Sequence, residues 1–363
     1  MSAIINPTNE LEESTMIKRA VIAFVVTVFS FSLSHVSFAM SFDEKALAAE
    51  AKDNFEPLPA TPQFKEDNPG GAAKIELGKT LYFDTRLSAS NVFSCNSCHN
   101  LALGGADNSS FSVGHKWEKG GRNAPTVFNA ALHIAQFWDG RAEDVEQQAG
   151  MPVLNPVEMN SSKDLVLERL GSIPQYLEMF DKAFPGQKPS LTYENVAKAI
   201  GAFERTLLTP SRFDEYLRGK LSALTMAEKE GLKLFIDTGC VICHNNVTVG
   251  GQSYQKFGLV KAPDFLTDNG RFDVTKNEDD MHVFKVPSLR NIELTYPYFN
   301  GGNIWDLKEA VKIMAAAQLG KELSDEDAGK IVVFLKSLTG KKPRIELPSL
   351  PPATQATSKP MTD

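Results

Sequence analysis

Two copies of one short motif contain every cysteine of this 363-residue chain. The pattern C-x-x-C-H occupies residues 95–99 and returns at residues 240–244. In this spacing the two thiols lie about one helical turn apart, so each can form a thioether to a haem vinyl group while the next imidazole reaches the iron. The repeated motif therefore predicts two covalently bound c-type haems. The predicted attachment residues are Cys95, Cys98, His99, Cys240, Cys243 and His244.

Two other uses of these cysteines stay open at this point. A zinc site, built from thiolates alone or from thiolates and imidazoles, would use the same side chains, and so would disulfides. Covalent haem would give red protein whose Soret band survives extraction with acid and acetone. Colourless protein that contains zinc would contradict the haem interpretation.

The charge and length of the chain limit its partners and its organisation. The formal net charge is -7, whereas a general nucleic-acid binder needs a basic face, so we expect no nucleic-acid partner. The negative charge is compatible with binding a basic protein. A chain of 363 residues is long enough for two domains with separate cores.

The N-terminal segment has the pattern of an export signal. A basic pair at residues 18–19 precedes an apolar run over residues 20–33, and small residues precede a cleavage site after Ala39. Residues 1–39 are therefore predicted to be a leader, and the acidic residues ahead of the basic pair favour Met16 as an alternative start. An uncleaved membrane anchor is the other interpretation. Export predicts a periplasmic protein, in the compartment where haem is attached covalently.

A second repeat precedes the two haem motifs. Residues 78–84 and residues 231–237 share Gly, Leu, an aromatic residue and Asp at the same offsets, and a haem motif follows each segment. The repeat predicts two cytochrome c-like domains that are related by internal duplication. The expected segments are an extension at 40–72, a first haem domain at 73–208, a second at 209–342 and a Pro-rich tail at 343–363.

Helical patterns predominate in the mature chain. Thr192 is expected to cap a helix with an apolar stripe, Thr225 to form a capping box with Glu228, and Ser324 to start the last helix. No sustained period-two alternation is present, so the fold is predicted to be mostly α. The domain junction is expected at residues 208–212, and the tail is expected to be extended and weakly ordered.

Longer motifs accompany the two haem sequences. They are Asn100-Leu101 with Gly104-Gly105, Gly114-His115, Arg122-Asn123-Ala124-Pro125-Thr126, Gln136-Phe137-Trp138-Asp139-Gly140-Arg141, Val157-Glu158-Met159, Val286-Pro287-Ser288-Leu289-Arg290-Asn291, Pro297-Tyr298-Phe299, and Met314 ahead of Gln318-Leu319-Gly320. With these motifs the chain resembles the bacterial di-haem cytochrome c peroxidases over nearly all of its mature length. The resemblance is far more specific than the haem motifs alone.

The resemblance implies that the N-terminal haem is the one that reacts with peroxide. His99 would be its first axial ligand, and His115, in a glycine-rich loop, its displaceable second ligand. Glu158 would be the acid–base residue and Gln148 would help to position peroxide. Without the resemblance, His115 and Glu158 would be interpreted as ordinary loop residues.

The C-terminal haem would be the centre where electrons enter. The resemblance implies His244 and Met314 as its axial ligands, a combination that raises the potential relative to two histidines. Met281 is nearer in sequence and is the rival ligand. Trp138 corresponds to a tryptophan between the two haems, although a single tryptophan is more often a packing residue.

A calcium ion between the domains is also implied by the resemblance. Asn123 would donate its side-chain oxygen, and Thr295 and Pro297 their backbone carbonyls, with waters completing the shell. Asn300 stands where relatives often have histidine, which puts any role for a histidine there in doubt. His133 and His282 are interpreted as structural or surface residues.

The expected activity is therefore the reduction of hydrogen peroxide to water. Electrons would come one at a time from a small soluble donor such as cytochrome c or a cupredoxin, and the resemblance suggests a homodimer. One alternative is an enzyme of the same superfamily that oxidises a partner protein to mature a tryptophan-derived quinone. That type lacks the distal His and has Tyr in place of Met. The other alternative is a pure electron carrier in which both irons are permanently six-coordinate.

Overall fold

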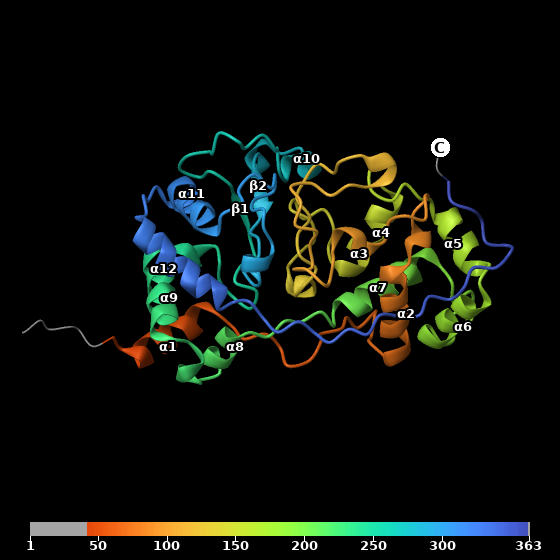
Figure 1. The fold of residues 1–363 in the computed structure, drawn as a ribbon, viewed down its shortest axis with the longest axis horizontal. Coiled ribbons are helices and arrows are strands. Elements are labelled where there is room, and N and C mark those ends of the chain that lie inside the picture. The colour runs from red at the N-terminus through yellow and green to blue at the C-terminus, as the bar shows by residue number, and fades with distance from the viewer. Residues whose placement is uncertain (1–41, 362–363) are drawn as a thin grey trace, which may run out of the picture. The chain divides into compact units, whose positions relative to one another are not determined.

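Two pairs of crossing helices form the centres of the structure. In the first half of the chain, α2 (Ala72–Phe83) packs against α7 (Tyr193–Glu204), and in the second half α9 (Met226–Thr238) packs against α12 (Asp325–Lys336). The two pairs lie in separate groups of helices in Figure 1. The computed structural model describes residues 42–361, so the predicted leader and the alternative start at Met16 lie outside the described residues.

A glycine permits the close approach of the helices in each pair. A Cβ atom on Gly78 would lie 1.8 Å from the carbonyl oxygen of Ala199, and one on Gly231 would lie 2.1 Å from the carbonyl oxygen of Lys330. No side chain fits at either distance, so the two backbones can touch only where the residue lacks a Cβ. The repeated glycine seen in the sequence therefore has the same structural role twice.

The remaining helices of the first half surround the pair α2–α7. Helices α4 and α5 pack against α7, and α6 packs against α2. Their buried apolar side chains join those of the central pair in one core. These elements are η1 (Thr85–Leu87), α3 (Cys95–Cys98), η2 (His115–Trp117), η3 (Ala130–Leu132), α4 (Val145–Leu154), α5 (Lys163–Gly171) and α6 (Pro174–Ala183).

The second half adds short helices and one small sheet. Strands β1 (Tyr254–Lys256) and β2 (Val283–Lys285) pair antiparallel, with Tyr254 opposite Lys285. The other elements are α8 (Arg212–Leu217), η4 (Leu221–Ala223), η5 (Cys240–Ile242), α10 (Phe272–Thr275), η6 (Glu278–Asp280), η7 (Ile292–Leu294) and α11 (Leu307–Leu319). The prediction of a mostly α fold is confirmed.

The helix starts follow the capping residues found in the sequence. Thr192 accepts a hydrogen bond from the N–H of Asn195, and Thr225 and Glu228 form a reciprocal capping box at the start of α9. Ser324 caps α12 in the same way. These side chains satisfy backbone donors that have no partner inside the helix, which is why they set its first residue.

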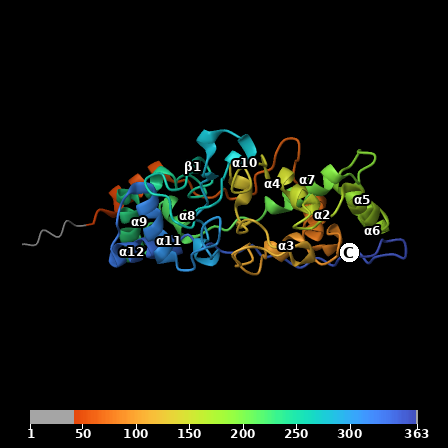
Figure 2. The same cartoon turned by 90° about the horizontal axis from the view of Figure 1, so that it is seen from above.

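The two ends of the described chain lie on opposite halves. The N-terminal helix α1 (Glu44–Asn54) packs against α8 and α9, and Lys229 pairs with Glu44. The tail runs the other way, past α2 towards α5 and α6, as Figures 1 and 2 both show. The N-terminal helix therefore packs on the second half, and the C-terminal tail packs on the first half.

The tail is extended, as predicted, but the expectation that it is weakly ordered is wrong. The guanidinium group of Arg169 is fully buried and donates to the carbonyl oxygen of Lys359 at 2.9 Å. Arg86 donates to the carbonyl oxygen of Pro351, and the N–H of Met361 donates to the carbonyl oxygen of Ala89. Composition alone could not show that two arginines of the first half offer donors to the backbone of the tail.

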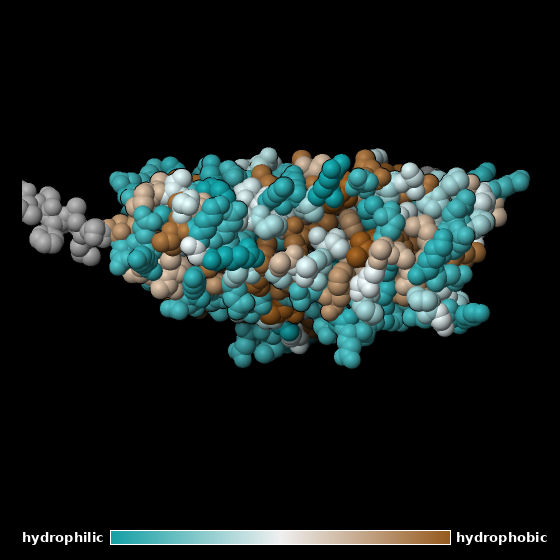
Figure 3. Space-filling model, turned by 90° about the horizontal axis from the view of Figure 1, so that it is seen from below, coloured by the Kyte–Doolittle hydropathy of each residue, from teal (hydrophilic) through white to brown (hydrophobic). Residues whose placement is uncertain are grey.

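The segment 208–212, where the domain junction is predicted, is partly buried. Thr209 is fully buried, and its hydroxyl accepts hydrogen bonds from the side-chain amides of Asn129 and Asn291, both at 2.8 Å. From Asp43 onward the chain forms one compact unit. In Figure 3 apolar residues gather in the middle of the face seen from below, while the outer helices are mostly hydrophilic.

No helix within residues 42–361 combines the length and the apolar character that crossing a bilayer requires.

Candidate functional site

The first C-x-x-C-H motif lies in a short capped helix. Ser94 and Ser97 form a reciprocal capping box around α3, and the hydroxyl of Tyr82 donates to the carbonyl oxygen of His99 at 2.6 Å. The Nδ1 atom of His99 lies 3.0 Å from the carbonyl oxygen of Pro125. A hydrogen bond from Nδ1 to a carbonyl fixes the tautomer that leaves Nε2 free to bind a metal.

The histidine of the second motif is buried as well, but its Nδ1 atom has no hydrogen-bond partner. Burial lowers the pKa of His244 to about 4, and the backbone carbonyls of Val249 and Pro287 partly oppose this shift. Burial likewise lowers the pKa of His99. Both imidazoles are therefore neutral at neutral pH, which is the form that binds iron.

A third internal repeat places a proline near each motif histidine. Pro125, which faces His99, is followed four residues later by Asn129, and Pro287, which faces His244, is followed four residues later by Asn291. Both asparagines have a left-handed backbone, with φ of 61° and 60°. The sequence analysis missed this P-[ST]-x-x-N repeat, although a self-comparison of the two halves would have found it.

The glycine-rich loop brings the backbones of His115 and Glu158 into contact. The backbone N–H of His115 donates to the carbonyl oxygen of Glu158 at 2.8 Å. A Cβ atom on Gly114 would lie 2.2 Å from the carbonyl oxygen of Val157, so only glycine allows this contact. His115 is 4% exposed, and neither of its ring nitrogens has a hydrogen-bond partner. A buried imidazole with two unpartnered nitrogens fits a missing metal ligand bond.

Glu158 lies in the turn that follows α4. The side-chain amide of Asn155 donates to its carboxylate at 2.7 Å, and the backbone N–H of Glu158 donates to the carbonyl oxygen of Asn155. Burial raises the pKa of Glu158, while Arg141 and Asn155 oppose the shift. A buried carboxyl group with a raised pKa, whose backbone is bonded to that of a buried histidine, is suited to proton transfer. Gln148 lies on α4 itself and is partly buried.

The second motif opens into a mostly apolar cavity. The cavity is lined by Cys240, Cys243 and His244, and helix α11 contributes Met314 to the same wall. Met314 also packs against a buried cluster that contains Phe257 and Phe284. Among the described residues that line this cavity Met281 does not appear. Met314, unlike its rival, therefore lines the cavity that His244 also lines.

Comparison with known proteins identifies this arrangement. Residues 72–222 match the family described as di-haem cytochrome c peroxidase, and residues 228–339 match cytochrome c. The cytochrome c551 peroxidase of Pseudomonas aeruginosa is 52% identical over 320 residues, which cover 87% of this chain and 92% of that protein. The chain belongs to the di-haem cytochrome c peroxidase family. The expectation of a peroxidase, an oxidoreductase, is thus confirmed at the level of the family.

Two further relatives support this assignment. The cytochrome c551 peroxidase of Nitrosomonas europaea is 47% identical over 332 residues, 90% of this chain and 96% of its own. A crystal structure of a MauG-like protein associated with microbial copper homeostasis has a TM-score of 0.70 and 29% identity. It covers 78% of this chain and 95% of its own. The fold is therefore shared by peroxidases and by MauG-like proteins.

The four cysteines of this family member are unpaired in the structure. The first two lie in the first half and the other two in the second, so they do not form a single four-thiolate site. No group of three or more His, Cys, Asp or Glu side chains within residues 42–361 could hold a metal ion. Burial raises the pKa of Cys98 and Cys240 to about 11.

Trp138 connects the two halves of the peroxidase fold. Its indole N–H donates to the carbonyl oxygen of Asn123 at 2.9 Å, and its own carbonyl oxygen accepts from the N–H of Lys285 at 2.7 Å. The ring packs against the apolar cluster of the second half, as Met314 does. Trp138 thus lines the cavity of the second motif although it belongs to the first half of the chain.

The three residues expected at a calcium site line this same cavity. They are Asn123, Thr295 and Pro297. The amide nitrogen of Asn123 donates to the carbonyl oxygen of Ser109, which leaves the side-chain oxygen as the acceptor expected of a calcium ligand. Asn300 instead has a structural role, because its backbone carbonyl accepts from Asn123 and its side chain donates to Asp268.

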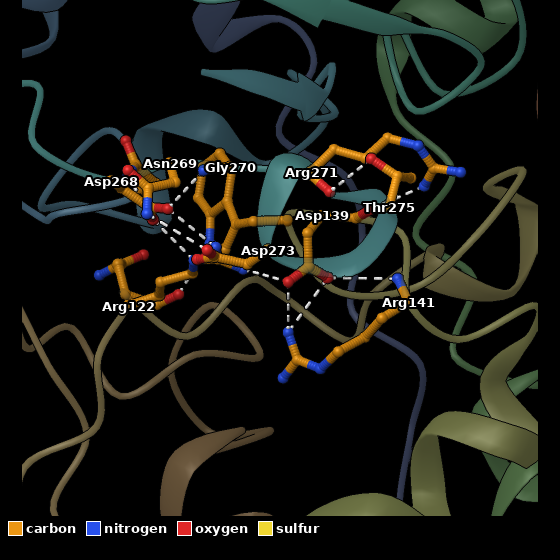
Figure 4. Close-up of polar contacts among 12 residues, drawn as sticks. Arg122, Asp139, Arg141, Asp268, Asn269, Gly270, Arg271, Asp273 and Thr275 are labelled. Carbon is orange, nitrogen blue, oxygen red and sulfur yellow. Dashed lines mark hydrogen bonds and ion pairs between the residues drawn. The ribbon is translucent and has the colours of Figure 1, made fainter. Parts of the chain in front are cut away.

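A network of ion pairs around Asp139, the residue that follows Trp138, joins loops of both halves, as Figure 4 shows for Arg122, Arg141 and Asp268. Arg122 pairs with Asp268 and Asp139, and Arg141 also pairs with Asp139. Arg271 donates to the backbone carbonyl of Asp139. Sequence reasoning missed Asp268, which carries no motif of its own and lies 146 residues from Arg122 along the chain.

Proposed function

We propose that this chain is a periplasmic di-haem cytochrome c peroxidase that reduces hydrogen peroxide to water. Its electrons would arrive one at a time from a small soluble donor such as cytochrome c or a cupredoxin. The observation that carries the proposal is the pair formed by His115, with both ring nitrogens enclosed and unpartnered, and Glu158, with its raised pKa.

The residues present fit two covalent haems. Cys95, Cys98 and His99 would hold one haem, and Cys240, Cys243 and His244 the other. When bound, the haem irons would supply the electron transfer and the cleavage of the oxygen–oxygen bond, which side chains alone cannot perform. The equivalent glycines, prolines and asparagines of the two halves support our proposal that the haem domains, at 73–208 and 209–342, arose by duplication.

At the first site we propose His115 as a ligand that can be displaced. The two residues that follow it, Lys116 and Trp117, have φ of 54° and 63°, which side chains of this size rarely adopt. Strain of this kind raises the energy of the closed loop, so the loop can release the imidazole at modest cost. Few large apolar side chains lie in the loop to oppose its movement.

Glu158 would move the proton during peroxide cleavage. Its carboxylate would accept a proton from one oxygen of peroxide and deliver it to the other, so that water leaves rather than hydroxide. Asn155 holds one carboxylate oxygen, which orients the group. Gln148 would bind peroxide through its side-chain amide.

At the second site we propose His244 and Met314 as permanent ligands of the centre where electrons enter. Met314 comes from the middle of α11 and packs in an apolar cluster, so no loop movement can remove it. Trp138 would lie between the two centres and support electron transfer between them. It belongs to the first half of the chain but lines the cavity of the second motif.

We further propose calcium at Asn123, Thr295 and Pro297, an export signal at residues 1–39, and a homodimer. The calcium proposal is supported by the common cavity wall and by the oxygen donors that calcium prefers. Metal analysis of protein purified with and without a chelator tests the ion. Mass spectrometry of exported protein tests the leader, and sedimentation tests the dimer.

One experiment separates this proposal from its rivals. Half-reduced protein should consume peroxide at steady state with a reduced cytochrome c donor, and it should bind cyanide or azide at the N-terminal centre. A pure electron carrier would do neither. An enzyme that oxidises a partner protein would lack a histidine at 115 and have tyrosine at 314, so His115 and Met314 speak against that alternative.

A further inference from the structure

Two basic side chains meet at the wall of the second cavity. Lys285, on β2, is 6% exposed, and its Nζ donates to the Nδ1 atom of His133 at 3.1 Å. Both residues line the cavity that also contains His244. Because Nδ1 accepts, the ring proton of neutral His133 is on Nε2, and this enclosed nitrogen has no partner.

The surrounding structure fixes both side chains. The N–H of Lys285 donates to the carbonyl oxygen of Trp138, and Lys285 pairs with Tyr254 across the sheet. His133 packs so closely against Gly251 that a Cβ there would lie 2.5 Å from its Cδ2 atom. Both side chains are therefore held in place by backbone contacts, those of Lys285 with Trp138 and those of His133 with Gly251. Two residues that met only by chance would not both be fixed in this way.

No carboxylate among the described residues lies within ion-pair distance of Lys285. The nearest acidic influence is Asp139, whose carboxylate is already bound by Arg122 and Arg141. Burial lowers the pKa of Lys285 to about 7, and burial followed by the charge of Lys285 lowers the pKa of His133. A buried amine is costly in free energy unless an anion accompanies it.

We propose that Lys285 and His133 form the binding site for a propionate carboxylate of the C-terminal haem. This rests on the proposed function, which places that haem in the cavity. The ammonium group and the Nε2–H of His133 supply two donors, and the rest of the wall is mostly apolar, so the cavity offers a carboxylate few other partners. This assignment replaces the interpretation of His133 as a structural or surface residue.

The pair also makes the C-terminal centre easier to reduce. A positive charge near the iron disfavours the ferric form, which carries one more positive charge than the ferrous form. Lys285 is therefore a positioning residue that binds the haem and raises its midpoint potential. The effect adds to that of the proposed His and Met ligands.

The test is a redox titration of the complete haem-loaded protein, in which the visible spectrum reports the ratio of ferric to ferrous haem. Lys285→Gln should shift the ferric-to-ferrous ratio of the C-terminal centre about tenfold towards ferric, a fall of about 59 mV for one electron. Lys285→Arg, which keeps the charge, should restore most of the potential. Lys256→Gln is the matched control, because this lysine is exposed on the paired strand β1 and should leave the potential unchanged.

Covalent haem content, measured by mass and by the pyridine haemochrome spectrum, separates the two proposals. A wild-type chain without haem would overturn the proposed function. Full haem content with an unchanged potential in Lys285→Gln would overturn the propionate site alone. Should that variant fail to fold, His133→Gln serves instead, with an expected shift of about threefold in the same direction, and an unchanged potential in it counts equally against the site.

Discussion

The two halves of this protein share a haem motif and a crossing of glycine-containing helices, but they differ in the segment proposed to supply the second ligand. The Nδ1 atom of His99 lies 3.0 Å from the carbonyl oxygen of Pro125, whereas the Nδ1 atom of His244 has no hydrogen-bond partner. The second ligand proposed for the first half is His115, in a loop whose next two residues have positive φ. The one proposed for the second half is Met314, in the middle of a helix.

The difference shows how one scaffold serves two purposes. A ligand in a loop can leave when its few contacts break, whereas a ligand on a packed helix cannot move without the helix. In the proposed function, the repeated part of the sequence specifies where a haem binds, and the part that is not repeated specifies whether its iron can open to a substrate.

Glu158→Gln tests the site that only the first half has, and it should have the largest effect. Loss of the proton-transferring group is expected to lower kcat/KM for peroxide about 10²- to 10³-fold, as measured by steady-state turnover with a reduced cytochrome c. Covalent haem content should not change. Glu143→Gln, an exposed carboxylate near the start of α4, is the control. Turnover near the wild-type rate would remove Glu158 from the mechanism.

Met314→Leu tests the fixed ligand of the second half. The charge-transfer absorption band from sulfur to iron should disappear, and turnover with the protein donor should fall about tenfold because the potential of the entry centre drops. Met281→Leu should retain both. If the band survives in the first variant and is lost in the second, the two methionines must exchange their assigned roles.

Thr209→Val tests the point where the halves share one hydroxyl. The side-chain amides of Asn129 and Asn291 would each lose a buried acceptor, so the free energy of unfolding should fall by about 2–4 kcal/mol in denaturant titrations. Thr209→Ser keeps the hydroxyl and should cost less than about 1 kcal/mol. Equal stability of both variants would show that the shared contact is unimportant.

Removal of residues 343–363 tests the dependence of the first half on the far end of the chain. Arg169 would lose its hydrogen bonds to Ser358 and Lys359, and the unfolding free energy should fall by about 1–2 kcal/mol. Glu346→Gln, an exposed tail residue, should have no effect. A truncated protein of full stability would support the weakly ordered tail that the composition suggested.

The smallest expected effect is a displacement of the acidic limb of the activity profile. As a base Glu158 must be ionised, and because burial raises its pKa, activity should begin to fall at a higher pH than an exposed glutamate would give. The measurement is kcat/KM against pH. In Asn155→Ala the carboxylate loses a donor that favours ionisation, so the limb should move further towards neutral pH.

Much of the fold follows from short stretches of sequence. The caps at Thr192, Thr225 and Ser324 and the apolar stripes behind them involve residues a few positions apart, and local hydrogen bonding and periodicity decide such features. The two haem motifs are local as well. The ordered tail, in contrast, could not be predicted, because it is held by Arg86 and Arg169, which lie far from it in the sequence.

The sequence by itself determined where two haems can attach, that the fold is mostly helical, and which family the chain resembles. Only the tertiary structure decided that Asp268 pairs with Arg122 and that Lys285 meets His133. The physical reason is distance along the chain. These partners are brought together by aperiodic loops, whose course depends on packing rather than on any spacing that a sequence displays.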